Sequence, residues 1–212
     1  MLTRKITFTA LACAAVLAGA AGREARAGND RPPSTPAPCS STSTPEYAAF
    51  AQARDELRRL AQRNAYSGVE TQFQIMLDNM HAGTACVIDK GDYVSGAVAA
   101  LMLGEPGRAR ARYLAAGAAG DVANIDRNFG SVAIDKQKKV NGKYPPLSRA
   151  VTDPALDAIT LPGGAEALAS ARQKLDVNGA FVGYLPNGHY ALDFTGKTFT
   201  VAGNTTGQVH VP

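Results

Sequence analysis

The side chains best suited to acid–base or metal chemistry are few and widely spaced in this 212-residue chain. Its three histidines, His81, His189 and His210, are far apart in the sequence. No His-Glu-x-x-His or Cys-x-x-Cys pattern occurs, so the sequence does not indicate a zinc, thioredoxin-type redox or c-type haem site built from neighbouring residues. It also lacks a Gly-x-Ser-x-Gly nucleophile motif and a phosphate-binding glycine loop. We therefore expect no metal and no cofactor, and we predict that the protein is not an enzyme.

The cysteines suggest a structural role instead. Cys13 lies in the apolar N-terminal stretch, whereas Cys39 and Cys86 follow it. If the N-terminal stretch is cleaved on export, two cysteines remain. An even number of cysteines in an exported chain favours a disulfide, so we predict a bond between Cys39 and Cys86. It would close a loop of about 47 residues and stabilise the fold by roughly 4 kcal/mol. Two free thiols are the alternative.

The one concentrated charge cluster is formed by four lysines within eight residues: Lys136, Lys138, Lys139 and Lys143. Such a cluster can contact an anionic surface, such as lipid headgroups, polysaccharide or an acidic protein. It is equally typical of a solvated loop or of an edge strand that lysines protect from aggregation. The sequence leaves both interpretations open.

The N-terminus has the three parts of a secretory signal. Arg4 and Lys5 are followed by an uncharged apolar run over 6–22 and then by Ala25-Arg26-Ala27, which offers small residues for signal peptidase. The run is at the short limit for spanning a bilayer. We predict that residues 1–27 are a signal peptide and that the protein is periplasmic or secreted, with no transmembrane segment after cleavage.

The signal peptide also explains most of the basic charge. The whole chain carries a formal net charge of +4, and residues 1–27 contribute three of these charges, which leaves about one for the rest. A nearly neutral chain has no bulk electrostatic footprint for DNA or RNA. We therefore expect no nucleic-acid partner.

The elements that position these residues change character along the chain. Residues 28–44 are rich in Pro, Ser and Thr, which predicts a disordered linker. Residues 45–120 form a helical region that opens with the helix-start pattern Thr44-Pro45-Glu46. Apolar side chains at helical spacing predict helices over 45–63 and 66–80, the second through Tyr66, Val69, Phe73, Met76 and Met80.

Two further helices are predicted over 93–103 and 108–118, separated by the breaker Gly104-Glu105-Pro106-Gly107. Small residues lie where the two helices meet, which lets their axes approach closely. These residues are Gly96, Ala97 and Ala100 on the first helix and Ala109 and Ala116 on the second.

The remainder, residues 121–212, is predicted to be a β-rich unit with one helix. A strand is expected over 131–134, a helix over 154–175 with a break at 161–164, and alternating strands from Gly179 onward. Leu185-Pro186-Asn187-Gly188 fits a turn between two strands. Helices first and strands later predict an α+β fold, in which helical hairpins pack with a small antiparallel β unit.

The second pair of helices resembles a tetratricopeptide-type repeat. The resemblance rests on Tyr93, Ala97, Ala100, Gly104, Ala109, Tyr113 and Ala116, although Tyr93 replaces the usual Trp and the terminal proline is missing. The resemblance implies a concave helical surface that binds an extended peptide. The candidate binding residues are the aromatics of this region, Tyr66, Phe73, Tyr93 and Tyr113.

The C-terminal unit resembles small extracellular β modules of the carboxypeptidase-regulatory-like and PEGA types. The resemblance rests on the run from Gly179 to Tyr190, which contains Leu-Pro-x-Gly-x-Tyr. In those modules this run turns the chain between two strands and its tyrosine packs inward. The resemblance implies a non-catalytic module of the cell envelope.

These features together predict an exported, non-enzymatic protein-interaction module with a protein or peptide partner in the cell envelope. One alternative is a structural surface component that oligomerises through β edges or the disulfide. Another is a hydrolase whose active site assembles from distant residues. The sequence leaves the oligomeric state open.

Overall fold

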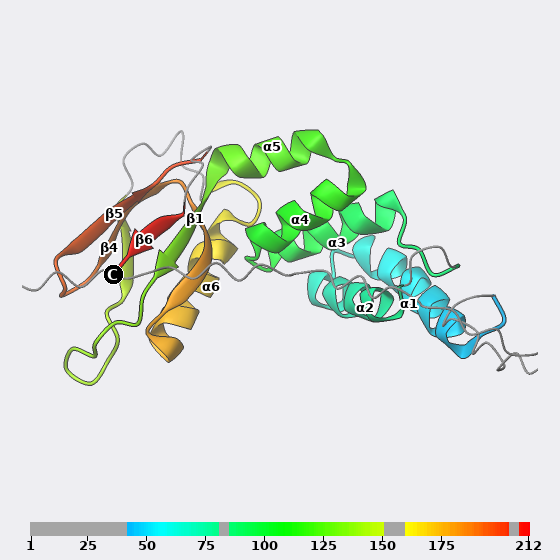
Figure 1. The fold of residues 1–212 in the computed structure, drawn as a ribbon, viewed down its shortest axis with the longest axis horizontal. Coiled ribbons are helices and arrows are strands. Elements are labelled where there is room, and N and C mark those ends of the chain that lie inside the picture. The colour runs from blue at the N-terminus through cyan, green and yellow to red at the C-terminus, as the bar shows by residue number, and fades with distance from the viewer. Residues whose placement is uncertain (1–41, 81–84, 151–159, 204–207) are drawn as a thin grey trace, which may run out of the picture. The chain divides into compact units, whose positions relative to one another are not determined.

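The first helix begins where the sequence predicts. In a computed structural model of the chain, which describes residues 42–80, 85–150, 160–203 and 208–212, α1 spans Pro45–Ala61 (Figure 1). The Thr44 hydroxyl accepts a hydrogen bond from the Tyr47 amide at 3.2 Å. Pro45 takes the first helical position, where its missing N–H removes no hydrogen bond. The predicted linker lies almost wholly outside the described residues.

Helix α2 (Tyr66–Asn79) packs against α1 around a shared apolar core. Cys86 and Ile88, from the segment before the next helix, complete this cluster. Burial of each large apolar side chain stabilises the fold by about 1.5–3 kcal/mol, so this cluster holds the two helices together. Its innermost members are less than 2% exposed: Phe50, Leu57, Val69, Phe73 and Met76.

Helices α3 (Lys90–Met102) and α4 (Pro106–Ala116) form the predicted hairpin. Ala97, Ala100 and Ala109 are fully buried, so the small residues do lie in the helix contact. Gly96 faces α2, because a Cβ added there would lie 2.5 Å from the Phe73 ring. Asp89 caps α3 by accepting a hydrogen bond from the Asp92 amide at 2.9 Å.

Helix α5 (Ala119–Asn128) was not predicted. Its sequence is mostly polar and its buried side chains are only Val122 and Ile125, which are too few to give a clear helical period. These two residues pack with Tyr113 and Phe129. The helical region therefore ends at residue 128, and below we call residues 45–128 the helical region and 129–212 the β unit.

The described residues of the β unit form two three-stranded sheets and one helix, which confirms the predicted α+β fold. One sheet has the order β3-β1-β6, with β1 (Phe129–Ile134) antiparallel to β3 (Phe181–Pro186) and parallel to β6 (Val209–Val211). The other has the antiparallel order β2-β4-β5, formed by Leu147–Ala150, Gly188–Leu192 and Lys197–Val201.

Helix α6 (Gly164–Asn178) completes the core of the β unit through Leu168, Ala171 and Leu175. Inward-facing side chains of both sheets join them, among them Val132, Leu185, Leu192 and Val201. Gly163, in a left-handed conformation with φ of 79°, precedes the first residue of α6. The residues predicted to be helical before the break at 161–164 lie outside the described part of the chain, apart from Thr160.

The predicted turn at 185–188 does lie between two strands, but these two strands do not form a hairpin. Strands β3 and β4 follow each other directly, but they do not pair, since β3 pairs with β1 and β4 pairs with β2 and β5. The chain passes here from one sheet to the other. Tyr190 nevertheless packs inward at 2% exposure and donates a hydrogen bond to the Pro186 carbonyl at 2.6 Å.

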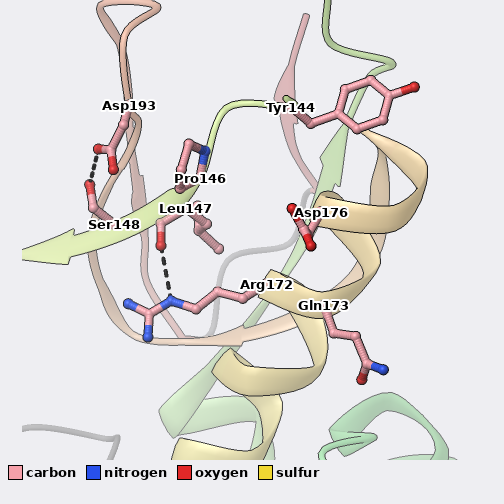
Figure 2. A pocket seen from close by; sticks show the side chains of 8 residues that line it. All are labelled: Tyr144, Pro146, Leu147, Ser148, Arg172, Gln173, Asp176 and Asp193. Atoms are coloured by element: carbon pink, nitrogen blue, oxygen red, sulfur yellow. Dashed lines mark hydrogen bonds between the residues drawn. The ribbon is translucent and has the colours of Figure 1, made fainter. Parts of the chain in front are cut away.

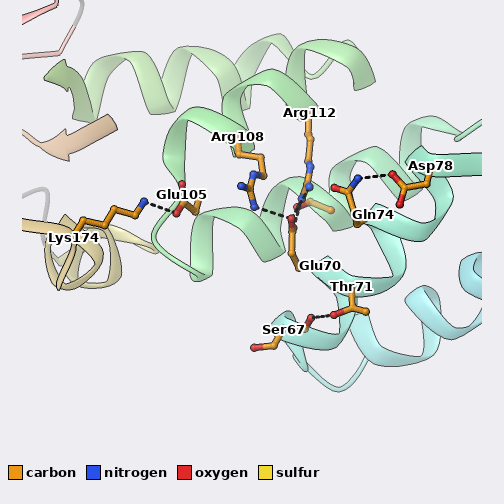
Figure 3. A network of polar contacts seen from close by, with 10 residues as sticks. Ser67, Glu70, Thr71, Gln74, Asp78, Glu105, Arg108, Arg112 and Lys174 are labelled. Atoms are coloured by element: carbon orange, nitrogen blue, oxygen red, sulfur yellow. Dashed lines mark hydrogen bonds and ion pairs between the residues drawn. The ribbon is translucent and has the colours of Figure 1, made fainter. Parts of the chain in front are cut away.

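The α3–α4 turn lies directly against α6. Gly104 has φ of 78°, and a Cβ added there would lie 2.4 Å from the Glu166 carbonyl oxygen. Lys174 of α6 also pairs with Glu105 at 2.8 Å (Figure 3). Gly104 thus serves two needs at once, a left-handed turn and a close backbone approach.

Candidate functional site

The aromatic side chains predicted to bind a peptide do not form a groove. Phe73 is fully buried and Tyr113 is 6% exposed, so both belong to cores and their predicted binding role was wrong. Their helical spacing has a simpler cause, because the buried stripe of an amphipathic helix has the same period as a binding stripe. Burial also raises the pKa of the Tyr113 hydroxyl.

Tyr66 and Tyr93 are half-buried at the rim of the same core. The Tyr93 ring meets the Phe73 ring edge-on, with centroids 5.6 Å apart, and its hydroxyl lies 3.6 Å from the Met80 sulfur. The Tyr66 hydroxyl donates to Asn64 at 3.3 Å. These contacts explain both residues by packing, and a binding role for them stays a prediction.

The polar side chains between α2 and α4 satisfy one another. Arg112 is 6% exposed, holds both carboxylate oxygens of Glu70 at 2.5 and 2.9 Å, and donates to the Gly96 carbonyl at 2.7 Å (Figure 3). Its guanidinium lies 4.1 Å from the centre of the Phe73 ring. Arg108 pairs with Glu70 as well, at 2.9 Å. This network leaves little hydrogen-bonding capacity for a ligand.

The electrostatics of Glu70 follow from this network. Burial opposes ionisation of the carboxyl group, but the hydrogen bonds and charges of Arg112 and Arg108 outweigh it and lower the pKa of Glu70. The pair therefore joins α2 to α4 through charges that are satisfied within the helical region.

The predicted disulfide involves one residue that the structure describes. Cys86 is fully buried in the core formed by α1 and α2. Cys39 lies outside the described residues, so the Cys39–Cys86 bond stays a prediction.

The histidines of the β unit have protein partners. His189 Nδ1 lies 2.9 Å from the Thr200 hydroxyl, and His210 Nε2 lies 3.0 Å from Asp135. His81 falls outside the described residues. Among the residues that are described, no three His, Cys, Asp or Glu side chains cluster as metal ligands do.

Ser148, His189 and Asp193 come from the neighbouring strands β2 and β4 and the turn after β4, but they do not form a catalytic triad. The Ser148 hydroxyl donates directly to Asp193 at 2.7 Å, while His189 contacts Thr200. A nucleophilic serine needs the imidazole between itself and the carboxylate.

One cavity of the β unit lies between α6 and β2. This cavity has a volume of about 540 Å³, and we call it the α6 groove. Its lining combines apolar, cationic and anionic side chains: Tyr144, Pro146, Leu147, Ser148, Arg172, Gln173, Asp176 and Asp193 (Figure 2).

Two polar contacts shape the α6 groove. Arg172 reaches from α6 to β2, where its Nε donates to the Leu147 carbonyl at 2.9 Å (Figure 2). On the opposite wall, Ser148 and Asp193 are hydrogen-bonded to each other. Asp176 lies one helical turn after Arg172 and projects from α6 toward the groove (Figure 2). The groove therefore offers a carboxylate acceptor and a guanidinium donor beside an apolar wall.

A second cavity of about 500 Å³ shares Tyr144, Pro146 and Asp176 with the α6 groove. It opens between residues 136–143, which we call the lysine loop, and the turn between β4 and β5. Its other lining residues are Val140, Asn141, Lys143, Pro145 and Phe194.

Tyr144 stands where the two cavities meet. Its ring packs on Gly179, where an added Cβ would lie 2.3 Å from the Tyr144 ring, and Lys136 and Lys139 lie 4.7 and 5.0 Å from the ring centre. A hydrogen bond with Lys136 is the main cause that lowers the pKa of the Tyr144 hydroxyl; burial opposes it, and the charges of both lysines add to it. Cations thus gather around an aromatic side chain at this point.

The sequence contained partial signals for this site. Arg172 and Asp176 have the i,i+4 spacing that places two side chains on one helix face, and the lysine cluster was visible. Ser148, Asp193 and Phe194 carried no signal, since their approach depends on the pairing of β2 with β4 and on the turn before β5.

No protein-family profile, curated protein or solved structure matches this chain. The two resemblances described above therefore stay expectations. Within the described residues, no helix has the length and hydropathy needed to cross a bilayer.

Proposed function

We propose that this protein is an exported, non-enzymatic interaction module that binds an extended segment of a protein partner in the α6 groove. The main support for this proposal is the lining of that groove. Asp176, Arg172 and the apolar wall around Tyr144 and Pro146 face one space of about 540 Å³. Binding sites of this size typically combine apolar walls with a few convergent polar groups.

The mixed charge of the groove favours a peptide segment over a small ion. A single anion would be repelled by Asp176 and Asp193, and a single cation by Arg172. An extended peptide carries amide donors, carbonyl acceptors and side chains of both signs along its length. Strand β2, which forms one wall, already engages α6 through the Leu147 carbonyl, so a segment lying there would meet both elements.

The export part of the proposal rests on residues 1–27, which have the order of parts of a secretory signal. It places the partner in the periplasm, at the cell surface or in the medium. The mature protein, recovered from the periplasmic fraction or the medium, is expected to begin at Gly28, which N-terminal sequencing measures. Recovery of the intact chain from the cytoplasm alone would contradict export.

Site-specific photocrosslinking in cells tests where the partner binds. A benzoylphenylalanine in place of Gln173 lies at the α6 groove, and one in place of Ala169 provides the matched control, because Ala169 is exposed on the same helix and lines neither cavity. We expect a discrete protein adduct from position 173 only. The additional change Asp176→Arg should weaken that adduct about tenfold, which corresponds to loss of one charge-assisted hydrogen bond. Equal adducts from 169 and 173, or none from either, would contradict the proposal.

A further inference from the structure

The lysine loop and the β4–β5 turn present two tips beside one another. In the lysine loop, Val140 and Lys143 form a bridge around Asn141 and Gly142, whose φ angles are 52° and 79°. Positive φ at both central residues is the signature of a tight hairpin turn. Val140, Asn141 and Lys143 line the 500 Å³ cavity together with Phe194 of the other turn.

Phe194 is the most exposed large apolar side chain among the described residues, at 82%. Its backbone has φ of 64°, a left-handed conformation that disfavours a bulky side chain. The exposed ring of Phe194 gains little from burial within the fold, and with Val140 it forms an apolar tip that is available for a contact outside the chain.

Positive charge surrounds this tip. Lys138, Lys139 and Lys143 are exposed, and no carboxylate of the described residues pairs with them. Lys136 instead binds the Asn178 carbonyl, and Lys197 binds Gln137 and the Pro212 carbonyl. The nearby acids are fewer: Asp135 pairs with His210, Asp193 accepts from Ser148, and Asp176 lines the cavity.

From this arrangement we infer that the two tips dock on the surface of an anionic lipid bilayer. Phe194 and Val140 enter the headgroup boundary, and Lys138, Lys139 and Lys143 lie against the lipid phosphates. A bilayer fits better than an acidic peptide, because Phe194 is 82% exposed and therefore turns most of its surface to the outside and little of it to the cavity that it lines. This inference is independent of peptide binding in the α6 groove.

The absence of tryptophan from the chain provides a local reporter. Phe194→Trp introduces a single tryptophan at the tip, which can be excited separately from the tyrosines. Leu114→Trp is the matched control, because Leu114 is 53% exposed on α4 in the helical region. With vesicles that contain phosphatidylglycerol, we expect a blue shift and quenching by brominated lipid for the Phe194→Trp variant alone. Because all variants share the same N-terminal residues, the difference reports on the substituted position.

Cosedimentation with the same vesicles measures the energetics in the full chain. Lys138→Glu combined with Lys143→Glu is expected to weaken binding at least tenfold, and Phe194→Ser about tenfold. The controls Lys90→Glu and Leu114→Ser, which lie on exposed positions of α3 and α4, should leave binding unchanged. Vesicles of phosphatidylcholine alone should bind weakly, and soluble glycerol phosphate should not displace the protein.

Several results would overturn the inference. They are equal binding to neutral vesicles, equal losses from the control variants, or an unchanged emission of the Phe194→Trp variant when vesicles are added. Binding of a polyglutamate peptide, without any binding of vesicles, would assign the lysines to an acidic protein instead. None of these results bears on the crosslink expected at position 173, so the two proposals fail separately.

Discussion

In the helical region, Phe73 is fully buried beneath the guanidinium of Arg112, whereas in the β unit Phe194 is 82% exposed at the tip of a turn. The charged groups differ in the same way. Arg112 is held by Glu70 and the Gly96 carbonyl, while Lys138 and Lys143 pair with no carboxylate of the described residues. Phe73 and Arg112 are thus satisfied within the fold, whereas Phe194, Lys138 and Lys143 are available for a contact outside it.

A buried aromatic stripe and an aromatic binding surface have the same period in the sequence, so only the burial of the side chains distinguishes them. The helices use their aromatic residues to build cores. The β unit provides cavities bounded by charged and apolar side chains of three different elements. Gly104 and the Glu105–Lys174 pair connect the α3–α4 turn with α6, so the helical region also supports one wall of the groove.

The largest expected effect comes from Phe73→Ala. Loss of a fully buried aromatic side chain, together with its contact to Arg112, should lower the free energy of unfolding by about 4 kcal/mol. Chemical denaturation measures it, with Phe194→Ala as the control that removes the same ring from an exposed site. A variant that unfolds like the wild type but loses partner binding would restore Phe73 as a binding residue.

The next effect concerns the buried ion pair. Arg112→Met keeps much of the side-chain volume but leaves Glu70 with Arg108 alone, and should cost about 3 kcal/mol. Arg59→Met is the control, since Arg59 pairs with Glu56 at an exposed position of α1 and should leave the denaturation midpoint unchanged. Equal effects from both variants would show that the Arg112–Glu70 pair contributes no more to stability than the exposed Arg59–Glu56 pair.

Acid should lower the stability of the helical region by protonating three of its carboxylates. The pKa values of Glu70, Asp89 and Asp126 are lowered in the folded chain. Their stabilisation is therefore complete above the pKa of the unfolded chain, about 4, and is lost as pH falls through the lower folded values. Denaturation between pH 6 and pH 2 should show this loss, and Glu70→Gln should flatten the slope. A free energy of unfolding that rises as the pH falls would contradict this prediction.

The smallest effect on the free energy of unfolding is expected at the β4–β5 turn, where the substitution should not destabilise the protein. Phe194→Gly relieves a left-handed backbone and removes no buried contact, so stability should stay constant or rise by up to about 1 kcal/mol. Gly196→Ala, at φ of 72° with open space around it, should instead cost about 1 kcal/mol. A clear loss of stability in Phe194→Gly would mean that the ring serves the fold.

Much of the helical architecture was predictable because it is local. Thr44 and Pro45 marked the start of α1, and the small residues of α3 and α4 marked their contact. Helix α5 escaped prediction because tertiary contacts of Val122 and Ile125 hold a mostly polar segment. The passage of the chain from one sheet to the other at Asn187 was not predicted, because the residues of a turn do not determine which strands pair.

The candidate site was less predictable than the fold. The lysine loop was recognised as a charge cluster, but the α6 groove depends on contacts between distant residues, such as Arg172 with Leu147 and Ser148 with Asp193. The exposure of Phe194 depends on the conformation of one turn. Such features arise from topology, which residue spacing alone does not encode.

Lysine acetylation footprinting tests most directly whether the β unit carries the recognition surfaces. The protein is labelled in intact cells of its source and again after purification, and the labelling of Lys138 and Lys143 is compared with that of Lys90 on α3. We predict that Lys138 and Lys143 are protected in the cells and become reactive on purification, while Lys90 reacts equally in both. Protection of Lys90 with unchanged labelling of Lys138 and Lys143 would contradict recognition by the β unit and would indicate a binding surface on the helices.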